Sequence, residues 1–208
     1  LNPSAGYLVG TEVSRKSISV AVTNFKGQLI EYQEGVPFSL GNSEESFREL
    51  CRHITGILEK AEIDPAHVLS YGFNLGGRVN NKTGYCFTYF IGEDRPIASF
   101  LQSELKRPVF VENDSRAMTY GEYICGAAND EDNMLFINVS WGLGMGMISD
   151  GKLSYGKSGF SGEIGHFPFL DNDQICHCGK TGCLETGASG SAIHRIFLEK
   201  LNDGRASL

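Results

Sequence analysis

The sequence predicts an α/β protein of two lobes, and three observations lead to this prediction. Short runs of β-branched and aliphatic residues alternate with longer segments of helical spacing, in the order three strands, helix, strand, helix, strand, helix. The opening pattern of strand, turn, strand and glycine turn then returns over residues 135–151. Hydrophobic residues make up 41% of the 208 residues, which is enough for a sizeable core.

The first lobe is expected to begin with three consecutive strands. Residues 7–13 and 17–23 are rich in β-branched residues and are separated by the polar turn Ser14–Lys16, so they predict a hairpin. A second turn at 24–27 leads into a third strand over about 28–33.

A helix follows, with Ser43 as its N-cap and with Glu44 and Glu45 in its first turn. Its apolar residues recur at helical spacing: Phe47, Leu50, Cys51, Ile54, Ile57, Leu58 and Ala61. The later elements of this lobe are a strand over 68–75 that ends at Gly76-Gly77, a helix over about 96–106, a strand over 109–112 and a helix over 115–125. We place the boundary between lobe 1–126 and lobe 127–208 after this helix.

The second lobe repeats the opening hairpin and then has one expected helix over about 186–201. Such a duplication is typical of two lobes with a ligand cleft between them, the ribonuclease H-like architecture of actin-like ATPases and sugar kinases. No later strand is visible in the sequence, and residue 1 is leucine rather than methionine. We therefore expect a truncated second lobe and a longer natural protein.

Composition limits the classes of partner. The net charge of −7 gives no general attraction for phosphate backbones, so nucleic acid would need a separate basic module. The sequence has no signal peptide and no apolar run near the roughly 20 residues that span a membrane. We expect a cytoplasmic protein without a membrane partner.

One stretch, residues 162–185, is dense in metal-binding residue types. Its three cysteines can supply three thiolates: Cys176, Cys178 and Cys183. Structural zinc takes four tetrahedral nitrogen or sulfur ligands. We favour His166 as the fourth ligand because it can close a loop over the ion, whereas His177 lies between two ligands. The alternatives are reduced thiols without a metal and, less favoured, a disulfide; we expect Cys51, Cys86 and Cys125 to be core thiols.

Two strings in this stretch carry a resemblance to a known family: Gly-Glu-Ile-Gly-His at 162–166 and Cys-His-Cys-Gly-Lys-Thr-Gly-Cys-Leu-Glu at 176–185. Together they resemble the signature of the ROK family (repressors, open reading frames and sugar kinases), and the resemblance covers nearly the whole chain. It implies that Glu163, His166 and Glu185 contact sugar hydroxyls and that His166 also ligates the zinc. It also implies a homodimer or homotetramer.

Asn113 and Asp114 follow a predicted strand and open the next helix. An aspartate there is often only an N-cap, but the carboxyl ends of strands also carry ligand-binding groups in α/β proteins. Such an aspartate can take the proton of a sugar hydroxyl that attacks a γ-phosphate. The resemblance implies that both residues contact sugar, that Asp114 is the general base in kinases, and that Gly77 lines the sugar pocket. Glu112 is expected to face elsewhere.

Both turns that hold ATP phosphates in kinases of this family are altered. The first usually reads Asp-Ile-Gly-Gly-Thr-Lys; here it is Glu12-Val13-Ser14-Arg15-Lys16-Ser17, so Glu12 takes the acidic place and Ser14 replaces a glycine. The second usually reads Gly-Thr-Gly; here it is Ser140-Trp141-Gly142. An indole cannot supply the threonine hydroxyl.

These losses beside a complete set of sugar-contact residues resemble the repressor branch of the family. We expect the ligand-sensing domain of a sugar-responsive repressor, with a hexose or amino sugar in the cleft between the lobes and an N-terminal helix-turn-helix outside this chain that binds DNA. The alternative is a glucokinase-like kinase of hexoses or N-acyl-hexosamines that uses ATP, magnesium and Asp114. A third possibility is a zinc-stabilised dimer module with a vestigial pocket.

Overall fold

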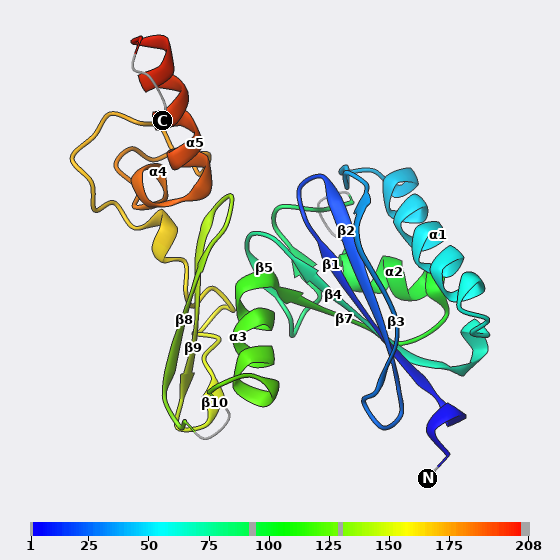
Figure 1. Cartoon of the computed structure of the whole chain (residues 1–208). Coiled ribbons are helices and arrows are strands. Elements are labelled where there is room, and N and C mark those ends of the chain that lie inside the picture. Colours follow the sequence, from blue (N-terminus) through cyan, green and yellow to red (C-terminus); the bar gives the residue numbers. More distant parts are fainter. Residues whose placement is uncertain (1, 92–94, 129–130, 205–208) are drawn as a thin grey trace. The chain divides into compact units, whose positions relative to one another are not determined.

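A computed structural model describes residues 2–91, 95–128 and 131–204 (Figure 1). The chain divides into two compact units, Leu1–Ala117 and Met118–Leu208, and each is described by itself. This division lies within helix α3 (Asp114–Cys125) rather than after residue 126, where we expected the boundary between lobes.

The first unit contains a mixed five-stranded sheet in the order β3-β2-β1-β4-β7. Its strands are β1 (Tyr7–Val13), β2 (Ser17–Asn24), β3 (Leu29–Pro37), β4 (Val68–Leu75) and β7 (Val109–Asn113). The first three strands pair antiparallel, while β4 is parallel to β1 and β7 is parallel to β4. Parallel neighbours require crossover connections, which contain the helices α1 (Glu44–Lys60) and α2 (Ile97–Leu105). The predicted order of strands and helices is confirmed.

The core of this unit lies between one face of the sheet and the two crossover helices. Buried side chains alternate along the strands and form one cluster with residues of α1 and α2, such as Phe47, Leu50 and Phe100. The Ser43 hydroxyl accepts a hydrogen bond from the Ser46 amide at 3.2 Å, so the predicted N-cap of α1 is present. A small hairpin of β5 (Val79–Asn80) and β6 (Tyr85–Cys86) follows β4.

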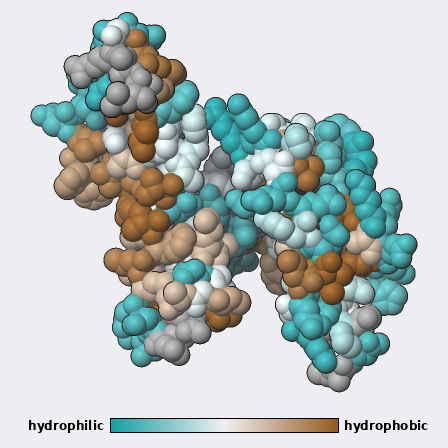
Figure 2. Space-filling model, viewed as in Figure 1, coloured by the Kyte–Doolittle hydropathy of each residue, from teal (hydrophilic) through white to brown (hydrophobic). Residues whose placement is uncertain are grey.

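The second unit begins its sheet with a hairpin like that of the first unit. The strands β8 (Met134–Val139), β9 (Leu143–Ser149) and β10 (Lys152–Leu153) form an antiparallel sheet in the order β10-β9-β8. The turn Ser140–Gly142 between β8 and β9 corresponds to the turn Ser14–Lys16 between β1 and β2, as the repeated sequence pattern predicts. Figure 2 shows hydrophobic surface over the region where β8 and β9 lie.

Two local expectations differ from the structure. The helix expected over 186–201 is two helices, α4 (Glu185–Ala188) and α5 (Gly190–Asn202), because Ser189 has an extended backbone and caps α5 through the Ala192 amide. Cys51 and Cys86 are buried as expected, but Cys125 is exposed at the last position of α3, so that expectation was wrong.

Among the described residues, no helix has the length and apolar character needed to cross a bilayer.

Candidate functional site

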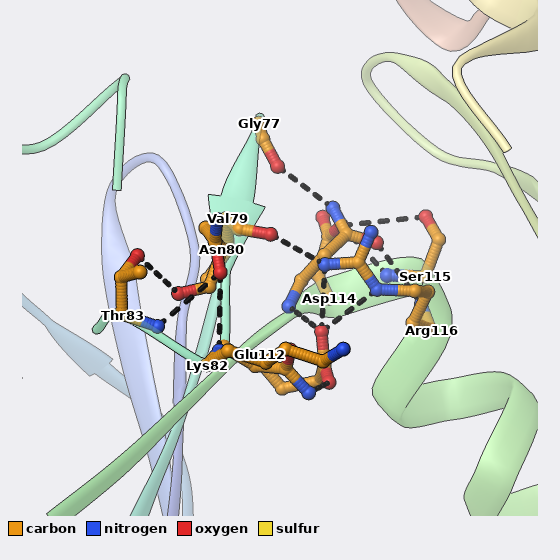
Figure 3. Close-up of polar contacts among 11 residues, drawn as sticks. Gly77, Val79, Asn80, Lys82, Thr83, Glu112, Asp114, Ser115 and Arg116 are labelled. Atoms are coloured by element: carbon orange, nitrogen blue, oxygen red, sulfur yellow. Dashed lines mark hydrogen bonds and ion pairs between the residues drawn. The ribbon is translucent and has the colours of Figure 1, made fainter. Parts of the chain in front are cut away.

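Asp114 stands where β7 passes directly into α3 (Figure 3). Its Oδ1 atom accepts hydrogen bonds from the Ser115 amide at 2.7 Å, the Ser115 hydroxyl at 3.3 Å and Asn113 Nδ2 at 2.9 Å. Within the described residues Oδ2 accepts none, so it is the oxygen that can bind a ligand hydroxyl. Burial raises the pKa of Asp114, the hydrogen bonds from Ser115 oppose this, and the charge of Glu12 adds to it.

Asn113 links this aspartate to the end of β4. Its Nδ2 atom donates to the Gly77 carbonyl at 2.9 Å as well as to Asp114. Its Oδ1 atom accepts from the Arg116 amide at 3.0 Å, which is the hydrogen bond of a helix cap. Asn113 is therefore the N-cap residue of α3, and the Oδ2 atom of Asp114 is not used in the cap.

Gly77 can only be glycine in this arrangement. Its φ of +86° is in the left-handed region, and a Cβ atom there would lie 1.9 Å from the Thr88 hydroxyl oxygen. The neighbouring Gly76 would place a Cβ atom 3.7 Å from Asp114 Oδ2, which is ordinary contact. Residues 76–77 thus lie directly beside Asn113 and Asp114.

Two further residues belong to this network: Arg116, which the sequence did not single out, and Glu112, which was expected to face elsewhere. The Arg116 side chain is 1% exposed and forms an ion pair with Glu112 at 2.7 Å. Glu112 therefore faces the junction between β7 and α3, and it accepts the Asn113 amide at 2.7 Å. The sequence held one signal for this pair, since Glu112 and Arg116 carry opposite charges at i,i+4 spacing. This spacing was not used because the helix was expected to begin only at residue 115.

In the second unit, the four predicted metal-ligating side chains lie together, with ligand atoms within 4.8 Å of one another: His166, Cys176, Cys178 and Cys183. Tetrahedral zinc would place two sulfurs about 3.8 Å apart, and a sulfur and a nitrogen about 3.6 Å apart. Here Cys178 Sγ lies 3.6 Å from Cys183 Sγ, and Cys176 Sγ lies 3.5 Å from His166 Nδ1. These side chains fit a zinc ion with little movement.

His166 has its two ring nitrogens in different surroundings. Nδ1 faces the thiol of Cys176, whereas Nε2 lies 3.9 Å from a carboxylate oxygen of Glu163. A histidine that binds metal through one nitrogen and meets a polar group at the other has a fixed ring orientation. Burial raises the pKa of the Cys176 thiol to about 12, so binding of a cation would be needed to keep it deprotonated.

Glu185 connects this loop to the sheet of the second unit. Its Oε2 atom accepts a hydrogen bond from the Leu143 amide at 2.8 Å, and its Oε1 atom lies 3.0 Å from His177 Nδ1. A Cβ atom at Gly142 would lie 2.8 Å from Oε2, so this carboxylate also packs against the second altered turn. Glu185 is thus a buried group of fixed position beside Cys176 and His177.

The second altered turn is bound to the start of α5. The Gly190 amide donates to the Ser140 carbonyl at 2.7 Å, and the Ser191 amide donates to the Trp141 carbonyl at 3.1 Å. The Trp141 side chain is 51% exposed, and its ring lies 5.7 Å from that of His194. Two amides at the start of α5 therefore bind protein carbonyls rather than an anion.

The first altered turn is closed by its own hydrogen bonds. The Ser14 amide donates to the Ser17 carbonyl at 2.9 Å, and the Ser14 hydroxyl donates to the exposed Glu12 carboxylate at 3.3 Å. Two later residues also bind the backbone of this turn. The Phe38 amide donates to the Lys16 carbonyl, and the Ser39 hydroxyl donates to the Arg15 carbonyl. The Ser14 amide and the carbonyls of Arg15 and Lys16 are thus bound within the protein.

The family model described as "ROK family" matches residues 8–207. The chain belongs to the ROK family. Among curated relatives, a xylose repressor from Bacillus spizizenii is 34% identical over 201 residues, which cover 96% of this chain and 52% of the relative. This ROK chain therefore spans about half the length of that relative.

Two solved ROK structures are similar to this chain. A ROK family transcriptional regulator described as a homolog of the E. coli MLC protein has a TM-score of 0.81 and 26% identity, over 99% of this chain and 52% of that one. A ROK family glucokinase from Streptomyces griseus in complex with glucose and AMPPNP also has a TM-score of 0.81, with 27% identity over 95% of this chain and 62% of that one. The predicted family and α/β fold are confirmed.

The predicted sugar-contact residues of this ROK chain form one group in each unit. Gly77, Asn113 and Asp114 are joined by hydrogen bonds in the first unit. In the second unit, Glu163 and Glu185 flank the loop that carries the histidines and the cysteines.

Proposed function

We propose that this chain is the sugar-sensing part of a sugar-responsive ROK repressor. Its hydroxyl-binding side chains are retained, while both turns that would hold ATP phosphates are altered. Similarity to a xylose repressor and to a ROK transcriptional regulator supports the same choice.

The observation that carries this proposal is the state of the turn Ser140–Gly142. A phosphate-binding turn needs free backbone amides and small side chains near the anion. Here an indole occupies the central position, the Ser140 amide donates to the Gly142 carbonyl at 3.1 Å, and the adjacent Leu143 amide donates to Glu185 Oε2 at 2.8 Å. The carbonyls of the turn accept hydrogen bonds from the first amides of α5. The turn is therefore better suited to hold α5 in place than to bind a nucleotide.

A structural zinc is part of the proposal, held by His166, Cys176, Cys178 and Cys183. The ion would cross-link the loop that carries Glu163 and Glu185, and with four protein ligands it would leave no open position for water. Its contribution would be to fold this loop and to orient His166, so that Nε2 faces a ligand hydroxyl and Glu163.

The proposed signal is a shift in population between two arrangements of the whole repressor. A sugar that binds one arrangement more tightly than the other shifts the equilibrium toward that arrangement. The size of the shift is set by the difference between the two affinities. In a cytoplasmic homodimer or homotetramer, this would change the spacing of DNA-reading helices located outside this chain. The expected ligand is a hexose or an amino sugar, and D-xylose is added because of the xylose repressor relative.

A sugar kinase is the second candidate because Asp114 fits a general base. Its Oδ1 atom is held by three donors while Oδ2 faces no donor of the described chain. Burial also raises its pKa, which favours proton uptake. Similarity to a ROK glucokinase supports this alternative.

Two measurements on the full-length protein separate the candidates. Melting temperatures are recorded with D-xylose, D-glucose and N-acetylglucosamine; a ligand at 100 times its Kd stabilises the fold by about 2.7 kcal/mol. ADP release is then measured with magnesium-ATP and each sugar, beside Asp114→Asn. A repressor shows a sugar-dependent rise without turnover. Turnover that is lost in Asp114→Asn would overturn the proposal in favour of a kinase, and no thermal response to any sugar would favour the zinc-stabilised dimer module.

A further inference from the structure

A buried ion pair lies directly beneath the junction of β7 and α3 (Figure 3). Arg116 donates to Glu112 Oε1 through Nε at 2.8 Å and through Nη2 at 2.7 Å. Arg116 is the largest fully buried side chain of the described residues. A charged group this deep is costly unless its position is fixed by several partners.

The ion pair joins the β5–β6 hairpin to the end of β7 and the start of α3, with contacts between residues 31 and 37 positions apart in the sequence. Arg116 Nη2 donates to the Val79 carbonyl in β5 at 2.7 Å, and Asn81 Nδ2 donates to Glu112 Oε2 at 3.0 Å. The pair therefore fixes the β5–β6 hairpin against the end of β7 and the first turn of α3. Gly77, which lines the proposed sugar site, lies just before this hairpin.

The same two residues also hold Asn113, because Glu112 Oε1 accepts both from the Arg116 guanidinium and from the Asn113 backbone amide. The Arg116 backbone amide donates to Asn113 Oδ1 at 3.0 Å, and the Asn113 backbone amide donates to Glu112 Oε1 at 2.7 Å. With Oδ1 bound to a donor, Nδ2 is directed toward the Gly77 carbonyl and Asp114 Oδ1. The Arg116 amide is a backbone group, so the side-chain pair acts on this hydrogen bond through Glu112 Oε1, which accepts from the Arg116 guanidinium and also holds the Asn113 backbone amide.

We infer that Arg116 and Glu112 are positioning residues that act through Asn113 to hold Asp114 with Oδ2 free for a ligand hydroxyl. The consequence for sugar binding rests on the proposed function. The consequence for Asp114 itself does not. Neither residue contacts the ligand in this account, so their effect must disappear when the Asn113 side chain is removed.

The test is a double-mutant cycle with Asp114 as the reporter. Removing one partner would leave a buried charge unpaired, so both are replaced together as Glu112→Gln/Arg116→Met, which keeps the net charge. The pKa of Asp114 is measured by carbon-13 NMR in the full-length protein, in this pair variant, in Asn113→Ala and in the combined variant. Glu12, Cys86 and Tyr89, the titratable groups that interact with Asp114, are the same in all four.

We expect the pair variant to raise the pKa of Asp114, because a hydrogen bond to the ionised carboxylate is lost. The pair substitution should have no further effect once Asn113 is alanine. An equal change in both backgrounds, or no change in the first, would overturn the inference. If the pair variant does not fold, Arg116→Lys completes the same cycle, since lysine keeps the charge but lacks the planar group that donates twice to one oxygen.

A second part of the test measures the affinity of the same variants for D-xylose and D-glucose. The pair variant should bind the responsive sugar about tenfold more weakly, which is the effect of one hydrogen bond in the site, and should cause no further loss in Asn113→Ala. Equal losses in both backgrounds would contradict the inference. If neither sugar binds the parent protein, the sensing function fails, while the NMR cycle still decides the positioning role.

Discussion

The Nδ1 atom of His177 lies 3.0 Å from Oε1 of Glu185, although His177 stands between two of the predicted zinc ligands. Its side chain is 72% exposed, whereas His166 is directed at the cysteines. The two histidines of this loop therefore have different expected roles: His166 completes the metal site, and His177 pairs with a carboxylate.

Zinc content should distinguish the two histidines. We expect about one zinc per chain in the parent protein and in His177→Ala, and loss of most of the metal in His166→Ala, since only His166 completes the four-ligand set. The measurement is zinc-to-protein stoichiometry by plasma mass spectrometry after dialysis against a weak chelator. Equal loss in both variants would show that the histidine roles are assigned incorrectly.

Metal and ligand roles should also separate by stability. Cys178→Ser removes a thiolate from a site whose binding energy contributes to folding, so we expect a large decrease in melting temperature. Glu163→Ala should leave the melting temperature of the unliganded protein nearly unchanged and abolish its increase with sugar. Thermal unfolding with and without sugar measures both. An unfolded Glu163→Ala would mean that this carboxylate is structural.

Gly77→Ala should be strongly destabilising for two reasons. Residue 77 has a left-handed backbone conformation, and the added Cβ atom would collide with the Thr88 side chain. We expect a loss of about 1–3 kcal/mol in the free energy of unfolding. Gly10→Ala in β1 is the matched control, since a Cβ atom there meets nothing within 4 Å. Urea unfolding compares the two. Similar values for both variants would contradict the strained position assigned to Gly77.

Asp114→Asn should stabilise the protein at neutral pH. The folded pKa of Asp114 is raised above its ordinary value of 3.8, mainly by burial, so the fold disfavours the ionised form. This cost is absent below the ordinary pKa, builds up between the ordinary pKa and the higher folded pKa, and is constant above the folded pKa. The stability difference between Asp114→Asn and the parent should therefore grow from acid to neutral pH in urea titrations. A difference that shrinks toward neutral pH would show that the carboxylate is stabilised instead.

Local patterns predicted much of the fold and most of the candidate site. Asn113 and Asp114 could be placed from sequence because a strand end and a helix start are both visible in neighbouring residues. The role of Arg116 could not, because its partner at Val79 is brought near only by the folded hairpin. The break at Ser189 was missed since the apolar spacing continues past it, whereas its hydroxyl caps the second helix.

The outer face of β8 has a practical consequence for protein production. Leu135, Ile137 and Val139 are exposed at alternate positions, and in the described part of the chain β8 pairs with β9 on one side only. An open strand edge with aliphatic side chains is a template for pairing between copies. Residues 1–208 should therefore self-associate as concentration rises, and light scattering over a concentration series would detect it.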